Sequence, residues 1–352
     1  MPRARPDPPA PTTPRAASAS PWRAVRLGAA VGLLPGALFG CGGDAPARTE
    51  GGAGPAGDAG GGERARFVVV THGQSADPFW SVVANGVADA AEALGVDAQY
   101  QAPGRFSMVE MADLIEAAVA SRPEGIAVSI PDADALGAAV RSALERGIHV
   151  VSLNSGSEVF GDLGIGAHVG QPDYEAGLRA GERMAGEGVR RALCVNHEVG
   201  NLSLDDRCRG FGDALARAGG ASRAVAVELA DPADTEERIA GALEDPSVDG
   251  LLTLGPAALG PALAALRRRE RRPRVAFATF DLSSEALDAL ERGELLFAVD
   301  QQPYLQGYLA VVSLVTATRT GTMPVGVVRT GPALVTAADV ERVRSATARG
   351  LR

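Results

Sequence analysis

From residue 67 almost to the end of the chain, hydrophobic and polar positions alternate between two periodic patterns. Short runs rich in β-branched residues alternate with longer stretches in which apolar residues recur every three or four positions. The short runs predict strands near 67–71, 97–101, 125–129 and 148–153 and, after a break at 164–172, near 191–195, 224–229, 248–254, 274–279 and 295–299. Strands that alternate with helices in this way indicate βαβ units and parallel sheets.

The predicted helices carry start and stop signals of their own. Ser107 and Glu110 form a capping-box pattern, and Gly95 and Gly147 close their helices. Two successive sets of βαβ units predict an α/β fold of two doubly wound, Rossmann-like lobes with parallel sheets, joined by a multi-strand hinge. Such sheets bind ligands at the carboxyl ends of their strands.

We interpret the chain as an export leader, a tether and two lobes. We expect a lipoprotein signal peptide at 1–40 and a flexible, disordered tether at 41–66. The N-terminal lobe is expected at 67–168 plus 302–330, and the C-terminal lobe at 169–301 plus 331–347.

The leader has the composition of an export signal. Five arginines precede the apolar run 27–40, and Leu38, Phe39 and Gly40 lead into Cys41. This ending resembles a bacterial lipobox, which implies cleavage before Cys41, lipid attachment to its sulfur and a periplasmic or cell-envelope location. An ordinary secretory signal with an incidental cysteine is the alternative. The arginine-containing region is long, so a start codon downstream of Met1 also remains open.

Composition limits the partners of the body. The full chain of 352 residues is 46% hydrophobic and is long enough for two cores. No stretch after residue 70 approaches the ~20 apolar residues of a membrane span, so we expect membrane contact only through the lipid anchor. The net charge is −9, and removal of the leader makes it about −13, which opposes nucleic-acid binding. The sequence contains no lysine, which excludes a P-loop lysine and a Schiff base.

Two further cysteines, Cys194 and Cys208, lie in one strand-to-helix segment. An oxidising compartment permits a disulfide between them, and two buried free thiols are the alternative.

Polar and aromatic residues that helix faces do not explain gather just after the predicted strands. In chain order these groups are His72, Asp77, Phe79 and Trp80 in a loop after the first strand; Asn154 and Ser155; Asn196, His197 and Glu198; Asp281; and Asp300, Gln301 and Gln302. Carboxylates, amides and an arginine fork bind neighbouring hydroxyls, while aromatic rings cover the C–H face of a sugar. The pattern therefore favours a binding cleft for a sugar or polyol, with no metal and no cofactor.

The chain also resembles the periplasmic solute-binding proteins of the ribose and galactose type, which feed ABC importers. The likeness covers about 67–345 and rests on the motifs DPFW at 77–80, DDRCRGF at 205–211, TFD at 279–281 and DQQPYLQGY at 300–308. It implies a monomer that is not an enzyme, closes on a sugar between its lobes and delivers it to ABC permease subunits.

Carried over by position, the resemblance implies that Asp77 binds sugar hydroxyls while Phe79 and Trp80 flank the ring, and that Arg207, Asp281 and Gln301 contact the ligand. Ribose-type members often have Asp-Arg where this chain has Asn154-Ser155, so Asn154 is a candidate contact and the identity of the sugar stays open. His72 and His197 are additional candidates.

Each candidate also has a purely structural interpretation. Those alternatives are a helix-turn role for Asp77, core packing for Trp80, a solvated charge cluster of Arg207 with Asp205 and Asp206, a structural hydrogen bond for His197, a helix cap for Asp281 and hinge packing for Gln301.

Other function classes find less support. The sequence has no G-x-S-x-G elbow, no H-E-x-x-H and no G-x-G-x-x-G after the first strand to support an enzyme. A DNA-binding regulator would need a helical domain where the leader and tether lie. A receptor that reports a sugar-like signal to a membrane sensor remains the alternative to transport.

Overall fold

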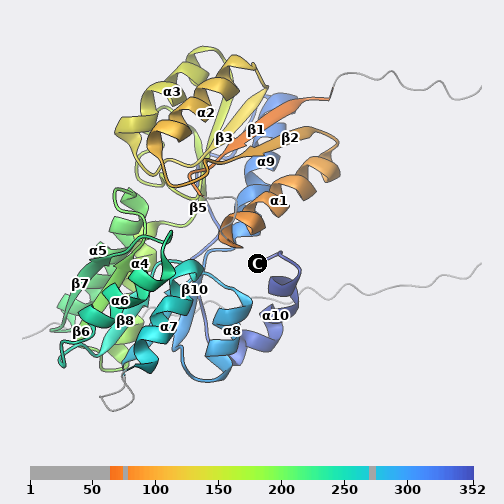
Figure 1. Ribbon diagram of the computed structural model, residues 1–352. Coiled ribbons are helices and arrows are strands. Elements are labelled where there is room, and N and C mark those ends of the chain that lie inside the picture. Colours follow the sequence, from red (N-terminus) through yellow and green to blue (C-terminus); the bar gives the residue numbers. More distant parts are fainter. Residues whose placement is uncertain (1–63, 74–77, 269–274) are drawn as a thin grey trace, which may run out of the picture. The chain divides into compact units, whose positions relative to one another are not determined.

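The computed structural model describes residues 64–73, 78–268 and 275–352 (Figure 1). Residues 61–352 form one compact unit. Within it lie two six-stranded sheets, and the lobe built on each is named here after its sheet. Sheet A has the strand order β11-β5-β4-β3-β1-β2, and sheet B has the order β12-β10-β9-β8-β6-β7.

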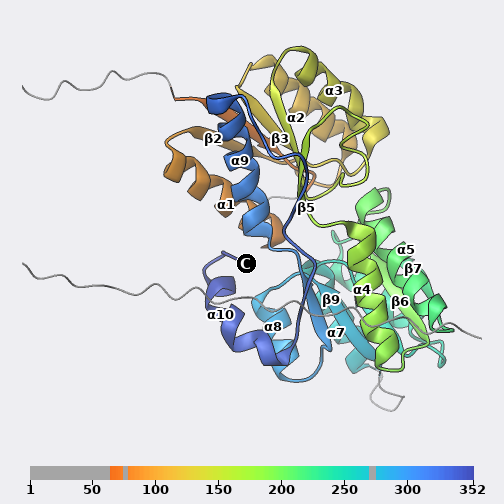
Figure 2. The ribbon, with the colours of Figure 1, turned by 180° about the vertical axis from the view of Figure 1, so that it is seen from behind.

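Sheet A is entirely parallel. Its strands are β1 (Arg66–Val70), β2 (Asp97–Gln101), β3 (Gly125–Val128), β4 (His149–Leu153), β5 (Ala167–Gly170) and β11 (Gly326–Arg329). Alternate residues of β1 face opposite sides: Val68 and Val70 pack toward α2 (Met108–Ala120) and α3 (Ala133–Glu145). Phe67 and Val69 pack toward α1 (Pro78–Leu94) and α9 (Pro303–Thr320). Both faces are therefore covered, as parallel sheets require (Figure 2).

Sheet B is parallel except for one edge strand. Its strands are β6 (Arg191–Asn196), β7 (Ala221–Ala226), β8 (Gly250–Thr253), β9 (Ala276–Phe280), β10 (Phe297–Asp300) and the antiparallel β12 (Ala333–Val335). One face carries α4 (Asp173–Gly186) and α5 (Leu202–Arg217). The other carries α6 (Pro232–Ala242), α7 (Leu259–Arg267), α8 (Ser284–Glu291) and α10 (Val340–Ala348).

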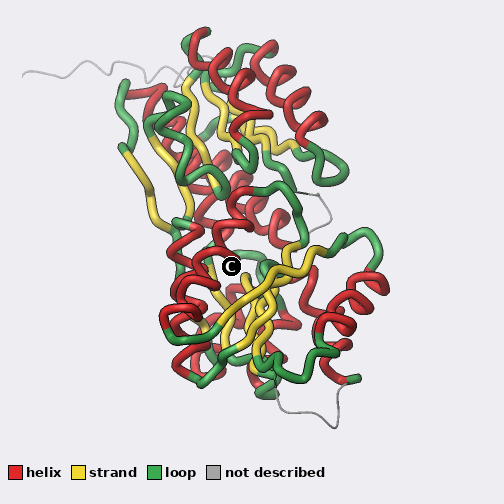
Figure 3. Tube along the Cα trace, turned by 90° about the vertical axis from the view of Figure 1, so that its left-hand side faces the viewer, coloured by secondary structure: helices red, strands yellow, loops and turns green. Residues whose placement is uncertain are grey.

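Three chain segments cross between the sheets. They are the short links from β5 to α4, from β10 to α9 and from β11 to β12. Each link is only a few residues long. Figure 3 shows the chain crossing between the two sets of strands. The predicted fold class of two doubly wound parallel lobes with a multi-strand hinge is confirmed.

Three local predictions were wrong. The break expected at 164–172 contains β5, a strand of sheet A that leads into the first crossing. The strand expected at 224–229 is β7 at Ala221–Ala226, an edge strand whose mostly exposed residues give no apolar run. Helix α1 already begins at Pro78, so Phe79 and Trp80 lie in its first turn and not in a loop.

Among the described residues, no helix has the length and apolar character that a membrane crossing needs. Within the same ranges, no group of three or more His, Cys, Asp and Glu is arranged to hold a metal ion.

Candidate functional site

The carboxyl ends of both sheets line one cavity of about 330 Å³, part of it open to solvent. The sheet-A lobe contributes His72 after β1, the aromatic pair of α1 and Asn154 after β4. The sheet-B lobe contributes residues after β6, β8 and β9, together with Arg207 from α5. This is the position that doubly wound sheets use for ligands.

Gln301 is the centre of the polar network at this cavity. It is 1% exposed and lies on the crossing from β10 to α9. Its Nε2 donates to both carboxylate oxygens of Asp281, at 2.9 and 3.1 Å. Its Oε1 accepts from Asn154 at 3.3 Å and from Arg207 at 3.4 Å. One side chain therefore bonds to residues of both lobes.

Gln306, in the first turns of α9, extends the network into the hinge. Its Oε1 accepts from Asn154 Nδ2 at 3.1 Å, and its Nε2 lies 3.1 Å from Gln301 Oε1 and 3.3 Å from Thr330 Oγ1. Thr330 lies on the third crossing segment. The cavity wall and the hinge thus share hydrogen bonds.

Backbone strain collects at the same place. Asn154, Asp281 and Gln302 have φ values of 60°, 66° and 55°. Asn154 and Asp281 directly follow β4 and β9, and Gln302 directly precedes α9. Asn and Asp tolerate this left-handed conformation better than most side chains. Ser283 caps α8 by accepting from the Ala286 amide, so the cap role considered for Asp281 is wrong.

Arg207 is buried, with 3% exposure. Its Nε donates to Asp173 at 2.7 Å, its Nη1 donates to the Leu254 carbonyl at 3.3 Å, and its guanidinium lies 4.6 Å from the centre of the Phe280 ring. The alternative of a solvated charge cluster is therefore wrong for Arg207. Burial raises the pKa of Asp173, and the charge of Arg207 opposes that shift.

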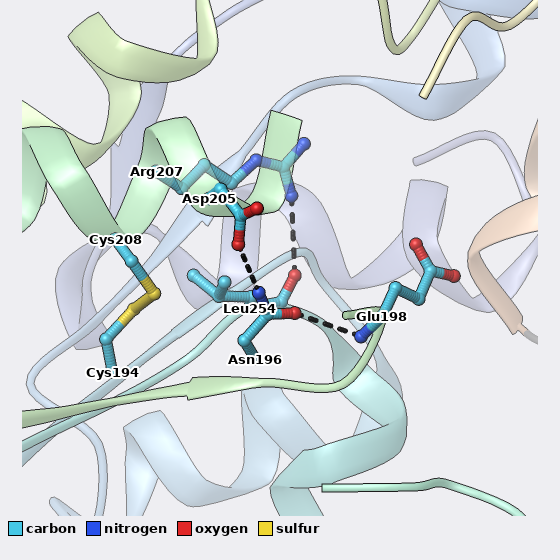
Figure 4. Close-up of a disulfide and its surroundings, with 7 residues drawn as sticks. All are labelled: Cys194, Asn196, Glu198, Asp205, Arg207, Cys208 and Leu254. Carbon is cyan, nitrogen blue, oxygen red and sulfur yellow. Dashed lines mark hydrogen bonds between the residues drawn. A yellow bond between two sulfur atoms is a disulfide. The ribbon is translucent and has the colours of Figure 1, made fainter. Parts of the chain in front are cut away.

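A disulfide joins Cys194 on β6 to Cys208 on α5, one of the two alternatives that the sequence left open. Figure 4 shows it beside Asn196, Glu198 and Arg207. It fastens the strand that ends at Asn196 to the helix turn that carries Arg207. The cross-link thus fixes two cavity-lining segments relative to each other.

The aromatic rings of His72, Phe79 and Trp80 pack against one another. Trp80 meets His72 edge to face at a centroid distance of 4.8 Å, and Phe79 meets Trp80 at 4.9 Å. A Cβ added to Gly73 would lie 1.6 Å from the Trp80 indole nitrogen, so only glycine fits there. Trp80 is 4% exposed and belongs to the core of its lobe. It therefore packs on the core and lines the cavity at once.

His72 and Glu198 pair across the lobes. His72 Nδ1 lies 2.8 Å from Ser129 Oγ, and its Nε2 lies 3.5 Å from Glu198 Oε2. Asn201 Nδ2 donates to the same carboxylate oxygen at 2.7 Å. Burial opposes ionisation of Glu198, but the His72 charge and the hydrogen bonds outweigh it and lower the pKa of Glu198 to about 2. Glu198 is therefore anionic at neutral pH.

The structure brings the described ligand-contact candidates to this cavity, whereas Ser155, Asn196, Asp300 and Gln302, which also lie at strand ends, are not among its lining residues. Its lining includes His72, Phe79, Trp80, Asn154, His197, Arg207, Asp281 and Gln301. Asp77 and the lipidation candidate Cys41 lie outside the described residues.

The individual predictions omitted part of the lining. Glu198 follows a strand and was noticed without a role, whereas Leu204, Leu254, Gly255 and Pro256 are apolar or small and carry no chemical signal. Asp173 was missed because an acidic residue in the first turn of a helix is expected for the helix dipole alone. Its 1% exposure is visible only in the fold.

The cavity suits a neutral, hydroxyl-rich ligand. Arg207 is its only described basic residue besides histidines, and that charge is already paired with Asp173. Asp281 adds a carboxylate, whereas the carboxylate of Glu198 pairs with His72. Burial lowers the pKa of His197, which keeps that ring neutral. The basic groups of the described lining are therefore already paired with acidic ones and offer an anionic ligand no free positive charge.

Comparison with known proteins agrees with this geometry. Residues 67–322 match the family profile described as a periplasmic binding protein domain. The chain is 25% identical over 266 residues to a xylose/arabinose-binding protein, XylF, of Sulfolobus acidocaldarius; the match covers 71% of this chain and 65% of that protein, just under two thirds of its length.

Two solved structures are similar over most of the chain. A carbohydrate transporter from Acidothermus cellulolyticus in complex with myo-inositol is 34% identical, with a TM-score of 0.78, over 82% of this chain and 100% of that chain. A periplasmic sugar-binding protein of an ABC sugar transporter from Legionella pneumophila is 27% identical, with a TM-score of 0.71, over 76% of this chain and 100% of that chain. The profile match spans well over half of the sequence, and the protein therefore belongs to the periplasmic binding protein family.

Proposed function

We propose that this protein is an extracytoplasmic solute-binding protein that captures a neutral sugar or sugar-like polyol between its lobes and delivers it to an ABC importer. The observation that carries the proposal is the network around Gln301. It joins Asn154 of the sheet-A lobe to Asp281 and Arg207 of the sheet-B lobe at one cavity.

The chemistry of the site supports binding without a reaction. Bidentate amide and carboxylate groups suit adjacent hydroxyls, and Phe79 and Trp80 offer aromatic surface beside them. A ligand that reached groups of both lobes would favour the state in which the lobes meet, which is hinge closure driven by differential contacts. The similar xylose/arabinose-binding protein and the similar carbohydrate transporter in complex with myo-inositol fit the same ligand class.

A thermal-shift screen tests this proposal. The probes are myo-inositol, D-glucose, D-galactose, D-xylose, L-arabinose and common sugar alcohols. A binder present at ~100 times its dissociation constant adds about 2.7 kcal/mol to the stability of the folded state. A raised melting temperature for at least one probe, confirmed by calorimetry, supports the proposal. A folded protein that responds to none of them contradicts it.

Anchoring and partners form the finer part of the proposal. We infer that residues 1–40 are a signal peptide, that Cys41 carries lipid and that the exported protein acts as a monomer with permease subunits of an importer. In a fractionated cell, Cys41→Ser should move the protein from the membrane fraction to the soluble fraction. An unchanged distribution would leave an ordinary secretory signal.

A further inference from the structure

A second cavity adjoins the polar one at the same interface between the lobes. It holds about 1300 Å³ of space, part of it open to solvent, and it shares His197 and Glu198 with the polar cavity. The sheet-A lobe contributes Pro78, Arg105 and Phe106, and the sheet-B lobe contributes the loops after β6 and β7 together with Ala257. We call the two spaces the inner cavity and the outer cavity.

The walls of the outer cavity differ in chemistry from those of the inner one. Most of its lining is apolar, including Phe106, Val199, Val227, Leu229, Ala230 and Ala257. Val199 is 68% exposed. Arg105, His197, Glu198 and Glu228 also line the outer cavity, so polar groups are present beside the apolar ones. The apolar majority of the wall gains free energy from covering an apolar group.

The junction between the cavities carries an unsatisfied polar atom. His197 Nδ1 is buried and has no hydrogen-bond partner among the described residues. His197 lines both cavities, and a Cβ added to Gly255 would lie 2.9 Å from its ring, so the imidazole is held against the backbone there. An ether oxygen that linked a group in one cavity to a group in the other would lie beside this ring. A neutral imidazole with its proton on Nδ1 can donate to such an oxygen.

We infer that the outer cavity is a second subsite, which binds an alkyl or aryl substituent joined through an ether or glycosidic oxygen to the polyol in the inner cavity. This inference rests on the proposed function, because the inner cavity must hold the polyol. It narrows the ligand class from free sugars to sugars or cyclitols with an apolar substituent.

The test compares each free polyol with its own substituted derivatives by titration calorimetry. The probes are D-glucose, D-galactose, D-xylose, L-arabinose and myo-inositol, with the isopropyl and phenyl glycosides or ethers of each, in both anomers where these exist. For the polyol that binds, we expect one derivative to bind about tenfold tighter or better, as an apolar group gains in a matching pocket.

Substitutions in the outer cavity locate the gain. Ala230 is exposed at its rim, and Ala230→Trp should bring the affinity ratio of derivative to free polyol back to about one by filling the space. Leu229→Glu, which puts a charge on the apolar wall, should do the same. The matched control is Ala216→Trp on the exposed face of α5, which should keep the ratio of the unsubstituted protein.

The outcomes separate the two proposals. Binding of a free polyol with weaker binding of every derivative overturns the second subsite and leaves the proposed function standing. A gain that survives both Ala230→Trp and Leu229→Glu also overturns it, because the substituent must then lie elsewhere. If neither the free polyols nor their derivatives bind, the proposed function itself fails.

Discussion

Asp281→Asn is the sharpest test of the polar network, because the substitution changes charge with little change in shape. Asp281 is 4% exposed and has a φ of 66°, a conformation that asparagine tolerates as well as aspartate does. The variant should therefore keep the backbone of the cavity wall. It loses the carboxylate that accepts from Gln301 and that we propose accepts from ligand hydroxyls.

The expected loss follows from the strength of charge-assisted hydrogen bonds. A hydrogen bond to a charged group contributes about 1.5–3 kcal/mol and a neutral one about 0.5–1.5 kcal/mol, so loss of the charge alone should cost about 1–1.5 kcal/mol. About 1.4 kcal/mol corresponds to a factor of ten in the dissociation constant, and ligand affinity should therefore fall by about 5- to 13-fold. The melting temperature of the unliganded protein should change less, since Gln301 keeps one acceptor at residue 281.

The assay is titration calorimetry with the polyol that the thermal-shift screen identifies. The control is Asp288→Asn in the same lobe, where the carboxylate is 49% exposed and pairs with Arg344 away from the cavity. Asp288→Asn should bind like the unsubstituted protein. If Asp281→Asn also binds within about twofold of that control, which is below 1 kcal/mol, Asp281 does not contact the ligand and the polyol site must lie elsewhere.

Three further predictions concern stability. Burial lowers the pKa of His168 from 6.5 to about 4, so between these pH values the unfolded chain binds more protons than the folded one. Up to about 3 kcal/mol of folding stability is therefore lost as the pH falls from 6.5 to 4. In urea denaturation at several pH values, His168→Asn should flatten this part of the stability profile. Replacing Cys194 and Cys208 by serine should cost about 2–4 kcal/mol in urea denaturation, and a smaller difference would show that the cross-link hardly restrains the unfolded chain. Arg207→Met leaves Asp173 buried and unpaired and should lower the free energy of unfolding by about 3–5 kcal/mol. The double variant Arg207→Met/Asp173→Leu should regain most of that stability. A double variant that is no more stable than Arg207→Met would refute the pairing.

The fold was predictable because its signals are local and repeated. Each parallel strand buried on both faces leaves an apolar run, and amphipathic helices leave a 3.6-residue pattern, several of them with a glycine of positive φ just after the helix. The exceptions have physical reasons. Strand β7 at the edge of sheet B has four exposed residues out of six, and β11 has no buried residue at all. Such strands are held by their neighbours and leave little pattern of their own.

The candidate site was predictable only where polar residues follow strands. Asn154, Asp281 and Gln301 stand out because nothing in a strand or helix face requires them. By contrast, Asp173 looks like an ordinary first-turn acid, and Leu254 contributes its backbone carbonyl to Arg207. A contact made by the main chain leaves no trace in residue identity. The outer cavity was also hidden, since alanine and valine in separate loops reveal a common wall only after folding.

The position of Gln301 connects ligand binding with movement of the lobes. Gln301 lies on a crossing segment, and its side-chain amide bonds to Asn154 of one lobe and to Asp281 and Arg207 of the other. Gln306 ties the same segment to Thr330 on another crossing. A hydroxyl-rich ligand that replaced or reinforced these bonds would act directly on the segments about which the lobes turn, with no relay between site and hinge. Coupling of this kind requires only that the ligand contact the network more favourably in one lobe arrangement than in another.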